Sequence, residues 1–263
     1  MCAGGKEDEV DTFRRLLETY PKGILSVVSD TWDLWKVCTE HVVTLKEEIL
    51  ARDGKLVIRT DSGNPVDIIC GSEDVFIHND PNSPERKGVI ELLWDIFGGT
   101  VNEQGYKVLD PHIGAIYGDS ITLERQIQIY ERLEAKGFAS TNIVLGVGSF
   151  TYQMNTRDTL GFAAKGAWFE VLELDPIANT PDENGVLGFK KVGYDIYKDP
   201  VTDDGTKKSL KGLIKVDTNL EVHTQCTWEE EDQGILRTIY EDGQFYNQAS
   251  LTEIRKRLNF ISK

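Results

Sequence analysis

Short runs of β-branched and other apolar residues alternate with helical patterns along most of the chain, and this alternation constrains the fold more than any other feature. The runs lie at 24–28, 55–59, 115–117 and 142–145. Buried strands that alternate with helices form a parallel sheet through right-handed crossovers. We therefore predict an α/β fold with a parallel sheet.

Apolar residues recur at helical spacing between these runs. Ser29 and Asp30 stand where a helix cap is expected, directly before a long helical pattern. The spacing predicts helices near 10–17, 31–52, 66–70, 83–97 and 123–133, and another from 149 to about 165.

The pattern changes at Trp168. Residues 168–174 are strand-like, and 175–215 are rich in Gly, Asp, Lys and Pro, which is typical of long loops. A small β region and a helix at 251–258 close the chain. We predict two parts: residues 1–174 form a β/α portion, and residues 175–263 form a loop- and β-rich C-terminal region that ends in a helix.

The formal net charge of -15 argues against binding to nucleic acid or to anionic membranes. A ligand that carries phosphate must therefore meet a local cluster of Arg, Lys and backbone N–H groups. The first residues contain no apolar signal-peptide region, and the four cysteines form no CxxC pair. These observations predict reduced, structural thiols and a cytoplasmic location.

Polar residues and glycines stand at the ends of the predicted strands, where an α/β protein builds its site. Each taken alone has a simpler explanation, because an Asp at a helix start is commonly a cap and a Gly-x-Gly is commonly a tight turn. Together they offer carboxylates for a metal or for sugar hydroxyls, an Arg for phosphate, and backbone N–H groups for an anion. The residues are Ser26, Asp30, Arg59, Asp61, Gly118, Asp119, Gly146, Gly148 and Ser149.

Four of these segments resemble the active-site segments of nicotinamide phosphoribosyltransferases, in the same order and at similar spacing. They are 26–30 (Ser-Val-Val-Ser-Asp), 58–65 (Ile-Arg-Thr-Asp-Ser-Gly-Asn-Pro), 117–119 (Tyr-Gly-Asp) and 145–149 (Leu-Gly-Val-Gly-Ser). The likeness continues through 156–158, Lys165 and 197–200 to about residue 256, and corresponds to the C-terminal half of such an enzyme. The Arg-x-Asp-Ser-Gly-Asn-Pro segment is the most specific part.

The resemblance implies an irregular β/α barrel of the type II phosphoribosyltransferase kind, of which this chain is the C-terminal half, with the small β-rich region appended. It implies a pentosyltransferase, a kind of glycosyltransferase, that acts in NAD biosynthesis as a homodimer. The enzyme joins nicotinamide to 5-phosphoribosyl 1-pyrophosphate and releases nicotinamide mononucleotide and pyrophosphate. Mg²⁺ is the implied cofactor, and coupling to ATP is left open.

The resemblance also assigns roles to residues. Asp61 and Asp30 are the implied catalytic residues; Asp61 acts with Arg59 and Mg²⁺ at the ribose and pyrophosphate, and Asp30 supports that cluster. Ser26 is expected near the nicotinamide amide. The ribose hydroxyls are assigned to Gly118 and Asp119, the 5′-phosphate to Gly148, Ser149 and Arg157, and additional positive charge to Lys165, Lys198 and Lys207.

The chain departs from the family pattern in two ways. Thr60 stands where members usually have Pro, which still permits an extended backbone. The catalytic His of the family, and the residues that hold the nicotinamide ring, would lie upstream of Met1. The four histidines do not match that His and are expected to be ordinary surface or core residues; they are His41, His78, His112 and His223.

These observations leave three readings open. The chain is one half of a split or truncated enzyme that needs its N-terminal complement; or it is a fragment that binds phosphoribosyl compounds or nucleotides without turnover; or it belongs with enzymes that use nicotinate.

Overall fold

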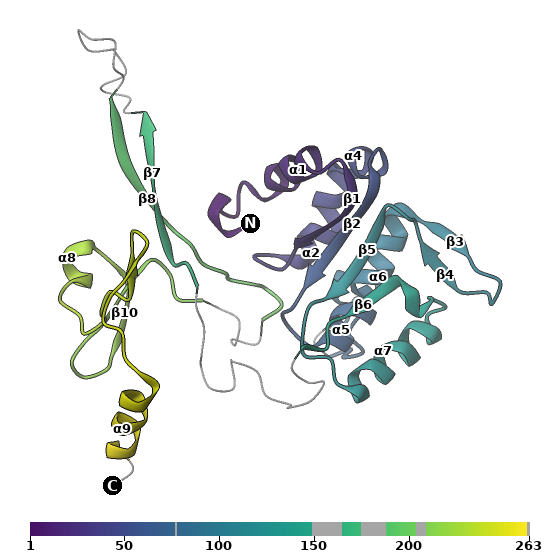
Figure 1. Ribbon diagram of the computed structural model, residues 1–263. Helices are drawn as coiled ribbons and strands as arrows, with labels where there is room; N and C mark the ends of the chain where they lie inside the picture. The colour runs from purple at the N-terminus through teal and green to yellow at the C-terminus, as the bar shows by residue number, and fades with distance from the viewer. Residues whose placement is uncertain (77, 149–164, 175–187, 204–208, 262–263) are drawn as a thin grey trace. The chain divides into compact units, whose positions relative to one another are not determined.

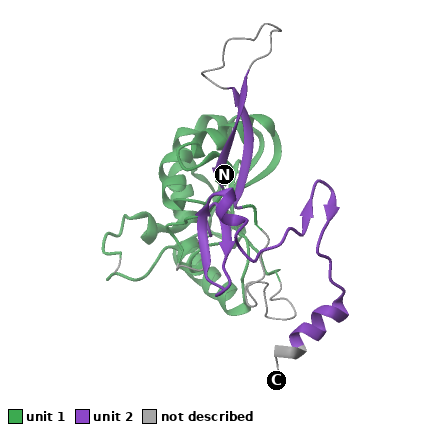
Figure 2. Cartoon of the chain, turned by 90° about the vertical axis from the view of Figure 1, so that its left-hand side faces the viewer, with its two compact units in different colours: residues 1–166, 196–209 green, residues 167–195, 210–263 purple. Residues whose placement is uncertain are grey.

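The computed structural model describes residues 1–76, 78–148, 165–174, 188–203 and 209–261. The chain forms two compact units (Figure 2). Unit 1 comprises residues 1–166 and 196–209, and unit 2 comprises residues 167–195 and 210–263. The expected boundary at residue 174 differs from this division, because the strand at 168–174 pairs with a later strand of unit 2 and residues 196–209 return to unit 1.

Unit 1 contains a four-stranded parallel sheet in the order β1-β2-β5-β6 (Figure 1). The register pairs Val28 with Arg59, Arg59 with Ile116, and Ile116 with Val144. All four carboxyl ends therefore meet at one edge. The predicted α/β fold with a parallel sheet is confirmed, and its strands are β1 (Lys22–Val28), β2 (Asp53–Thr60), β5 (Ile113–Tyr117) and β6 (Ile143–Leu145).

Several helices of unit 1 begin at side chains that accept a backbone N–H bond. Asn64, Ser83 and Thr122 cap α5, α6 and α7 in this way. The antiparallel hairpin of β3 (Gly99–Val101) and β4 (Lys107–Leu109) was not predicted. The helices are α1 (Glu9–Thr19), α5 (Pro65–Cys70), α6 (Pro84–Phe97) and α7 (Leu123–Ala135), with short 3₁₀ turns η1 (Cys2–Gly4) and η3 (Ser140–Asn142).

The long helix predicted at 31–52 is an interrupted series of short segments. Its cap is Asp33, whose carboxylate accepts the N–H of Lys36, and not Asp30 as expected. The π-helical turn η2 brings Val37, Cys38 and His41 together into the core. The segments are α2 (Leu34–Lys36), η2 (Val37–His41), α3 (Val42–Thr44) and α4 (Lys46–Leu50).

One face of the parallel sheet packs on the hydrophobic core, through residues such as Leu56 and Ile58. The opposite face contains Ile24 and Val144, which are 79% and 59% exposed. Parallel sheets are ordinarily covered on both faces. The exposed apolar side chains mark a sheet face with little cover.

The described residues of unit 2 form small antiparallel sheets and two helices. Trp168 and Trp228 meet edge to face with ring centroids 5.0 Å apart. None of its described hydrophobic side chains is fully buried. Strands lie within 175–215, where only loops were expected. The elements are β7 (Trp168–Leu174), β8 (Phe189–Asp195), β9 (Leu213–Val216), β10 (Val222–Cys226), α8 (Trp228–Glu231), β11 (Tyr240–Glu241), β12 (Gln244–Phe245) and α9 (Leu251–Ile261).

The helices within the described ranges are all too short or too polar to cross a membrane.

Candidate active site

Asp30 is fully buried just after β1 and ties the ends of β1 and β2 together. Its Oδ2 atom accepts the backbone N–H groups of Asp61 and Ser62, each at 2.8 Å, and the Ser62 hydroxyl at 2.7 Å. Its Oδ1 atom is buried and accepts no hydrogen bond from the described residues. Asp30 therefore fixes the turn that presents Asp61.

Lys198 comes from a segment far along the chain and reaches the same carboxylates. Its Nζ atom lies 3.2 Å from Asp61 Oδ1 and 3.8 Å from Asp30 Oδ1. The Lys198 side chain is 17% exposed. An ammonium that is mostly removed from water thus stands between two carboxylates.

Arg59 lies at the end of β2, against the backbone of Gly118 at the end of β5. A Cβ at Gly118 would stand 3.1–3.3 Å from the guanidinium atoms, so a larger residue would crowd Arg59. A Cβ at Gly146 would overlap the Gly118 carbonyl, and one at Gly148, whose φ is +58°, would overlap the Asp119 carboxylate. These three glycines let neighbouring strand ends approach each other closely.

Two side chains near this edge, Tyr117 and Lys165, have pKa values that are shifted by burial and by the surrounding charges. Burial raises the pKa of Tyr117, and the nearby carboxylates of Asp61, Asp30 and Asp119 raise it further. The Tyr117 hydroxyl donates to the Gly63 carbonyl at 2.8 Å. The pKa of Lys165 is lowered, mainly by partial burial and further by the nearby positive charge of Lys198. The negative charge of Asp61 acts in the opposite direction.

The structure thus gathers Asp30, Asp61 and Lys198 directly, with Arg59 on Gly118 and Asp119 beside Gly148 at the same edge of the sheet. Ser26 is exposed on β1, on the face of the sheet to which Arg59 also belongs. Thr60 keeps the extended backbone expected of it, as the last residue of β2. Ser149, Arg157 and Lys207 lie outside the described residues, as does the predicted helix that starts at 149.

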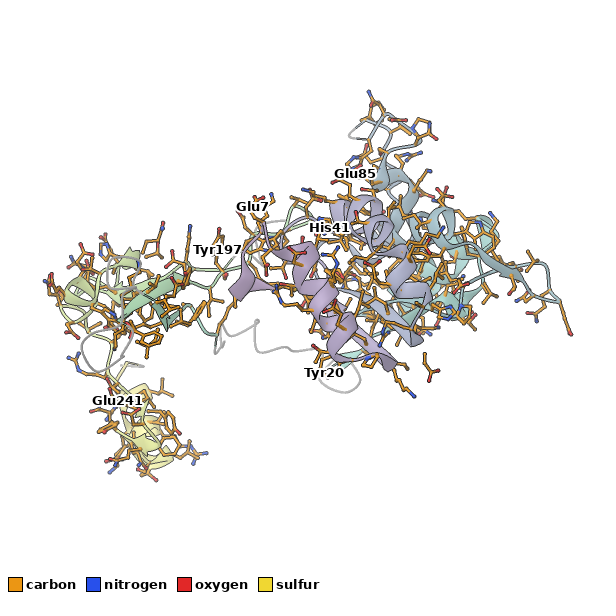
Figure 3. All side chains as sticks on the ribbon, turned by 90° about the horizontal axis from the view of Figure 1, so that it is seen from above. Glu7, Tyr20, His41, Glu85, Tyr197 and Glu241 are labelled. Atoms are coloured by element: carbon orange, nitrogen blue, oxygen red, sulfur yellow. The ribbon has the colours of Figure 1, made fainter. Side chains whose placement is uncertain are left out.

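The histidines lie apart from these carboxylates. His41, labelled in Figure 3, is buried, and its Nδ1 atom lies 3.6 Å from Oε2 of the buried Glu9. Burial lowers the pKa of His41 and raises that of Glu9 to about 7. His112 pairs with Asp110, and His223 pairs with Asp217 in unit 2. His78 lines the acidic pocket described next.

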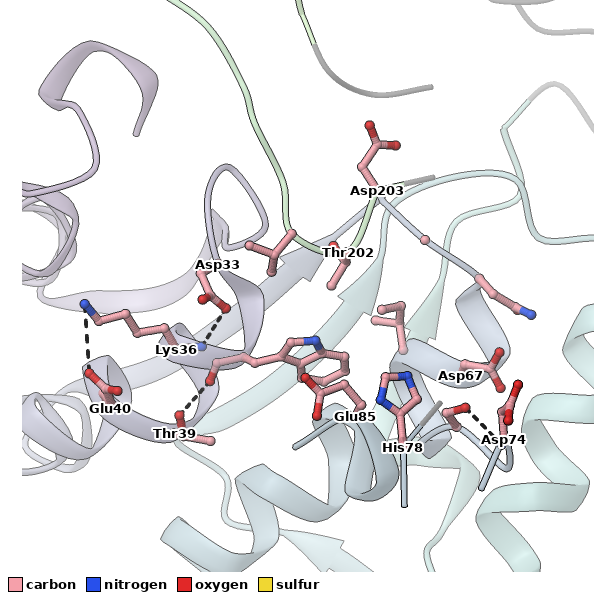
Figure 4. A pocket seen from close by; sticks show the side chains of 16 residues that line it. Asp33, Lys36, Thr39, Glu40, Asp67, Asp74, His78, Glu85, Thr202 and Asp203 are labelled. Carbon is pink, nitrogen blue, oxygen red and sulfur yellow. Dashed lines mark hydrogen bonds and ion pairs between the residues drawn. The ribbon is translucent and has the colours of Figure 1, made fainter. Parts of the chain in front are cut away.

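A pocket of about 640 Å³ opens beside Thr202, between the start of α2 and the start of α5 (Figure 4). Its basic lining residues are Lys36 and His78, and they stand among many carboxylates. Lys36 is already engaged by Glu40 at 4.0 Å. Such a lining repels phosphate, so the strand-end cluster suits an anion better than this pocket. The carboxylates are Asp33, Glu40, Asp67, Asp74, Glu85 and Asp203.

The strand-end cluster can hold a divalent cation and an anion together. The carboxylate of Asp61 is 30% exposed and stands beside Asp30 Oδ1, a buried oxygen with no hydrogen bond from the described residues, so the cluster has an excess of negative charge. Carboxylate oxygens are the ligands Mg²⁺ prefers, so these residues fit it. Arg59 and Lys198 supply positive charge for phosphate.

Sequence reasoning did not single out Ser62 or Thr202, whose hydroxyls lie 2.6 Å apart. Ser62 follows Asp61 in the most specific motif, so its position was a usable signal. Thr202 is 140 residues away from Ser62, and no local pattern points to it.

Comparison with known proteins gives consistent matches. A model described as the nicotinate phosphoribosyltransferase (NAPRTase) family matches residues 1–173. A protein of Acinetobacter baylyi named nicotinamide phosphoribosyltransferase is 48% identical over 268 residues, which cover 98% of this chain and 49% of that protein.

Two further relatives have the same name. The Mycoplasma pneumoniae protein is 43% identical over 81% of this chain and 42% of its own length. The Xanthomonas campestris protein is 32% identical over 97% of this chain and 49% of its own length. The chain therefore spans about half the length of the curated relatives that it matches.

Proposed function

Because this chain belongs to the nicotinate phosphoribosyltransferase (NAPRTase) family, we propose that it supplies the phosphoribosyl-pyrophosphate-binding part of a nicotinamide phosphoribosyltransferase. The observation that carries the proposal is the gathering of Asp61, Asp30 and Lys198 at one edge of a parallel sheet, beside Arg59. Nicotinamide is favoured over nicotinate because the relatives at 48%, 43% and 32% identity are named for it.

The proposed chemistry follows from the charges. Displacing pyrophosphate from the anomeric carbon builds positive charge on the ribose and negative charge on the leaving group. Arg59 and Lys198 stabilise the leaving group, and Asp119 holds ribose hydroxyls while its negative charge favours the cationic sugar. Mg²⁺, when bound by Asp61, would neutralise pyrophosphate charge. Asp30 is buried and acts by holding the Asp61 turn in place.

The remaining roles are part of the same proposal. Ser26 contacts the nicotinamide amide, and Gly118 approaches the ribose. Gly148, Ser149 and Arg157 bind the 5′-phosphate, and Lys165 adds positive charge. The assay below, run with and without ATP, decides whether turnover is coupled to ATP hydrolysis. The proposed enzyme is a cytoplasmic homodimer.

The proposal includes a complementary polypeptide that completes a β/α barrel. Ile24 and Val144 are exposed on the open sheet face, and β1 and β6 are edge strands of the described sheet. Unit 2 fully buries none of its described hydrophobic side chains. A segment equivalent to the unmatched half of the relatives would cover such surfaces.

The test has two arms. The first measures nicotinamide mononucleotide formed by the 263-residue chain from phosphoribosyl pyrophosphate, nicotinamide and Mg²⁺, with and without ATP. The second adds the part of the A. baylyi relative that this chain does not match. We expect turnover only in the second arm, and Arg59→Ala should abolish it. Turnover near 1 s⁻¹ by the chain alone, the low end for typical enzymes, would contradict the complementation. No product in either arm, with both parts folded, would contradict the activity.

A further inference from the structure

We propose that Thr202 is a positioning residue that places the Lys198 ammonium, acting through Ser62 and Asp30. The inference rests on the proposed function, in which Lys198 meets pyrophosphate, and adds to it the device that holds this lysine. Its starting observation is the pair of hydroxyls, Ser62 Oγ and Thr202 Oγ1, 2.6 Å apart.

The segment Tyr197–Thr202, here called the strap, is held to the strand ends along its length. The Asp199 N–H donates to the Thr31 carbonyl at 3.1 Å, and the Val201 N–H donates to the Trp32 carbonyl at 2.8 Å. The Tyr197 ring packs edge-on against Trp32, with centroids 5.0 Å apart. Both bonded carbonyls belong to buried residues that follow Asp30.

The strap is also held at Lys198 itself and at its last residue, Thr202. The Lys198 N–H donates to the Ser209 hydroxyl at 2.7 Å, which holds its backbone. At the other end, the Thr202 carbonyl packs on Gly63, where a Cβ would stand only 2.6 Å from that oxygen. Gly63 has φ +80°, a conformation that favours glycine. The strap thus rests directly on the turn that contains Asp61.

The direction of each hydrogen bond can be derived. The Ser62 hydroxyl donates to Asp30 Oδ2, because a carboxylate oxygen that also accepts two backbone N–H groups offers only lone pairs. Ser62 has one hydroxyl hydrogen, and this bond uses it. Thr202 must then donate to Ser62. The result is a directed chain from Thr202 through Ser62 to Asp30, in which each bond polarises the next.

This series of hydrogen bonds determines where Asp30 Oδ1 points. Three donors occupy Oδ2, and so Oδ1 is the atom turned toward Lys198, 3.8 Å from its Nζ. Asp61 Oδ1 lies 3.2 Å from the same Nζ. Loss of the Thr202 hydroxyl would remove the bond that ties the end of the strap to Ser62, while Ser62 keeps its own bond to Asp30. The strap would then shift, and the Lys198 ammonium would lose its fixed position between the carboxylates.

Thr202→Val is the informative variant because it keeps the shape and removes the hydroxyl, and Thr202→Ser keeps the hydroxyl. A ligand-free readout is the side-chain amine signal of Lys198 in a ¹H–¹⁵N spectrum of the full chain labelled on lysine, assigned by Lys198→Arg. We expect this signal to shift or broaden in Thr202→Val and to stay in place in Thr202→Ser. The exposed Thr141→Val is the matched control. An unchanged signal in Thr202→Val overturns the proposal.

Calorimetry with inorganic pyrophosphate and Mg²⁺ tests the link to the site. Thr202→Val should weaken binding about fivefold, within the range of a lost hydrogen bond, and Thr202→Ser should bind within about twofold of the wild type. In a Lys198→Ala background, Thr202→Val should have no further effect. A loss that persists in that background overturns positioning through Lys198. A wild-type chain that binds no pyrophosphate, but shows the spectral change, contradicts the proposed function and leaves the positioning device standing.

Discussion

Glu9 offers a sharp test of the packing in unit 1, because it is a carboxyl group buried beside His41. Its side chain is 2% exposed, and Oε1 accepts no hydrogen bond from the described residues. Burial, then the charge of Asp33, raises the pKa of Glu9 from 4.5 to about 7, while the N-terminus, Lys36 and Lys6 oppose the shift. The native fold therefore holds Glu9 protonated in mildly acidic solution, where the unfolded chain holds it ionised.

The effect on stability follows from proton counting. Between pH 4.5 and about 7, native Glu9 binds a proton that the unfolded chain has released, so its contribution to stability falls as pH rises through this range. Above about pH 7 the fold holds a buried carboxylate. A shift from 4.5 to about 7 corresponds to roughly 3 kcal/mol at 1.36 kcal/mol per unit.

His41 acts in the opposite direction over part of this range. Burial lowers its pKa below 6.5, so the unfolded chain binds the extra proton, and stability falls as pH decreases below 6.5. Near pH 5.5 the two contributions to the proton count oppose each other. At pH 8 His41 is neutral in both states, and the cost of ionised Glu9 remains alone.

Glu9→Gln removes that charge with little change in shape. At pH 8 the variant should be more stable than the wild type by about 2–3 kcal/mol, or roughly 4–12 °C in Tm at 2–4 °C per kcal/mol. At pH 5.5 the difference should fall to about 1.4 kcal/mol, because only one of the roughly 2.5 pH units between the two pKa values has been crossed. Circular dichroism melts at both pH values measure this, with Glu18→Gln on the exposed side of the same helix as the control. Equal shifts at both pH values, or a less stable variant at pH 8, would refute the reasoning.

Three further predictions concern local structure. Asn64→Ala removes the cap of α5 and should cost about 1 kcal/mol in the free energy of unfolding, measured by urea denaturation. Gly146→Ala places a methyl group against the Gly118 carbonyl and should cost about 1–3 kcal/mol in the same assay; an unchanged midpoint would mean that the strand ends separate easily. Burial raises the pKa of the Cys38 and Cys70 thiols to about 12, so at pH 8 a thiol reagent should label the other two cysteines and reach these two only after unfolding.

The order of strands and helices could be predicted because hydrophobic period is a local signal. The runs at 24–28, 55–59, 115–117 and 142–145 all fall in β1, β2, β5 and β6 or within a residue of their bounds. The prediction of one helix at 31–52 was wrong in detail, because a π turn interrupts it at Val37–His41. In that turn His41 contacts Glu9, and no local hydrophobic period encodes such a tertiary contact.

The site was predictable in part for the same reason. Asp61 and Arg59 were found from their place at a strand end. From the residues alone Asp30 was expected as a helix cap, and only the resemblance placed it with Asp61; its bonds go to residues 31 and 32 positions later, at the end of the neighbouring strand. Thr202 reaches this edge only through the fold, 140 residues along the chain from Ser62, so no local pattern could indicate it.

The charge balance of the site connects these findings. The chain has a net charge of -15, and its strand-end lysine is engaged by two carboxylates. The ammonium of Lys198 therefore offers little net charge to an incoming phosphate while both carboxylates face it. A divalent cation held by Asp61 would neutralise that carboxylate and leave Lys198 free to pair with the anion. We infer that pyrophosphate and Mg²⁺ bind together at this edge, and that the strap keeps Lys198 within reach of both partners.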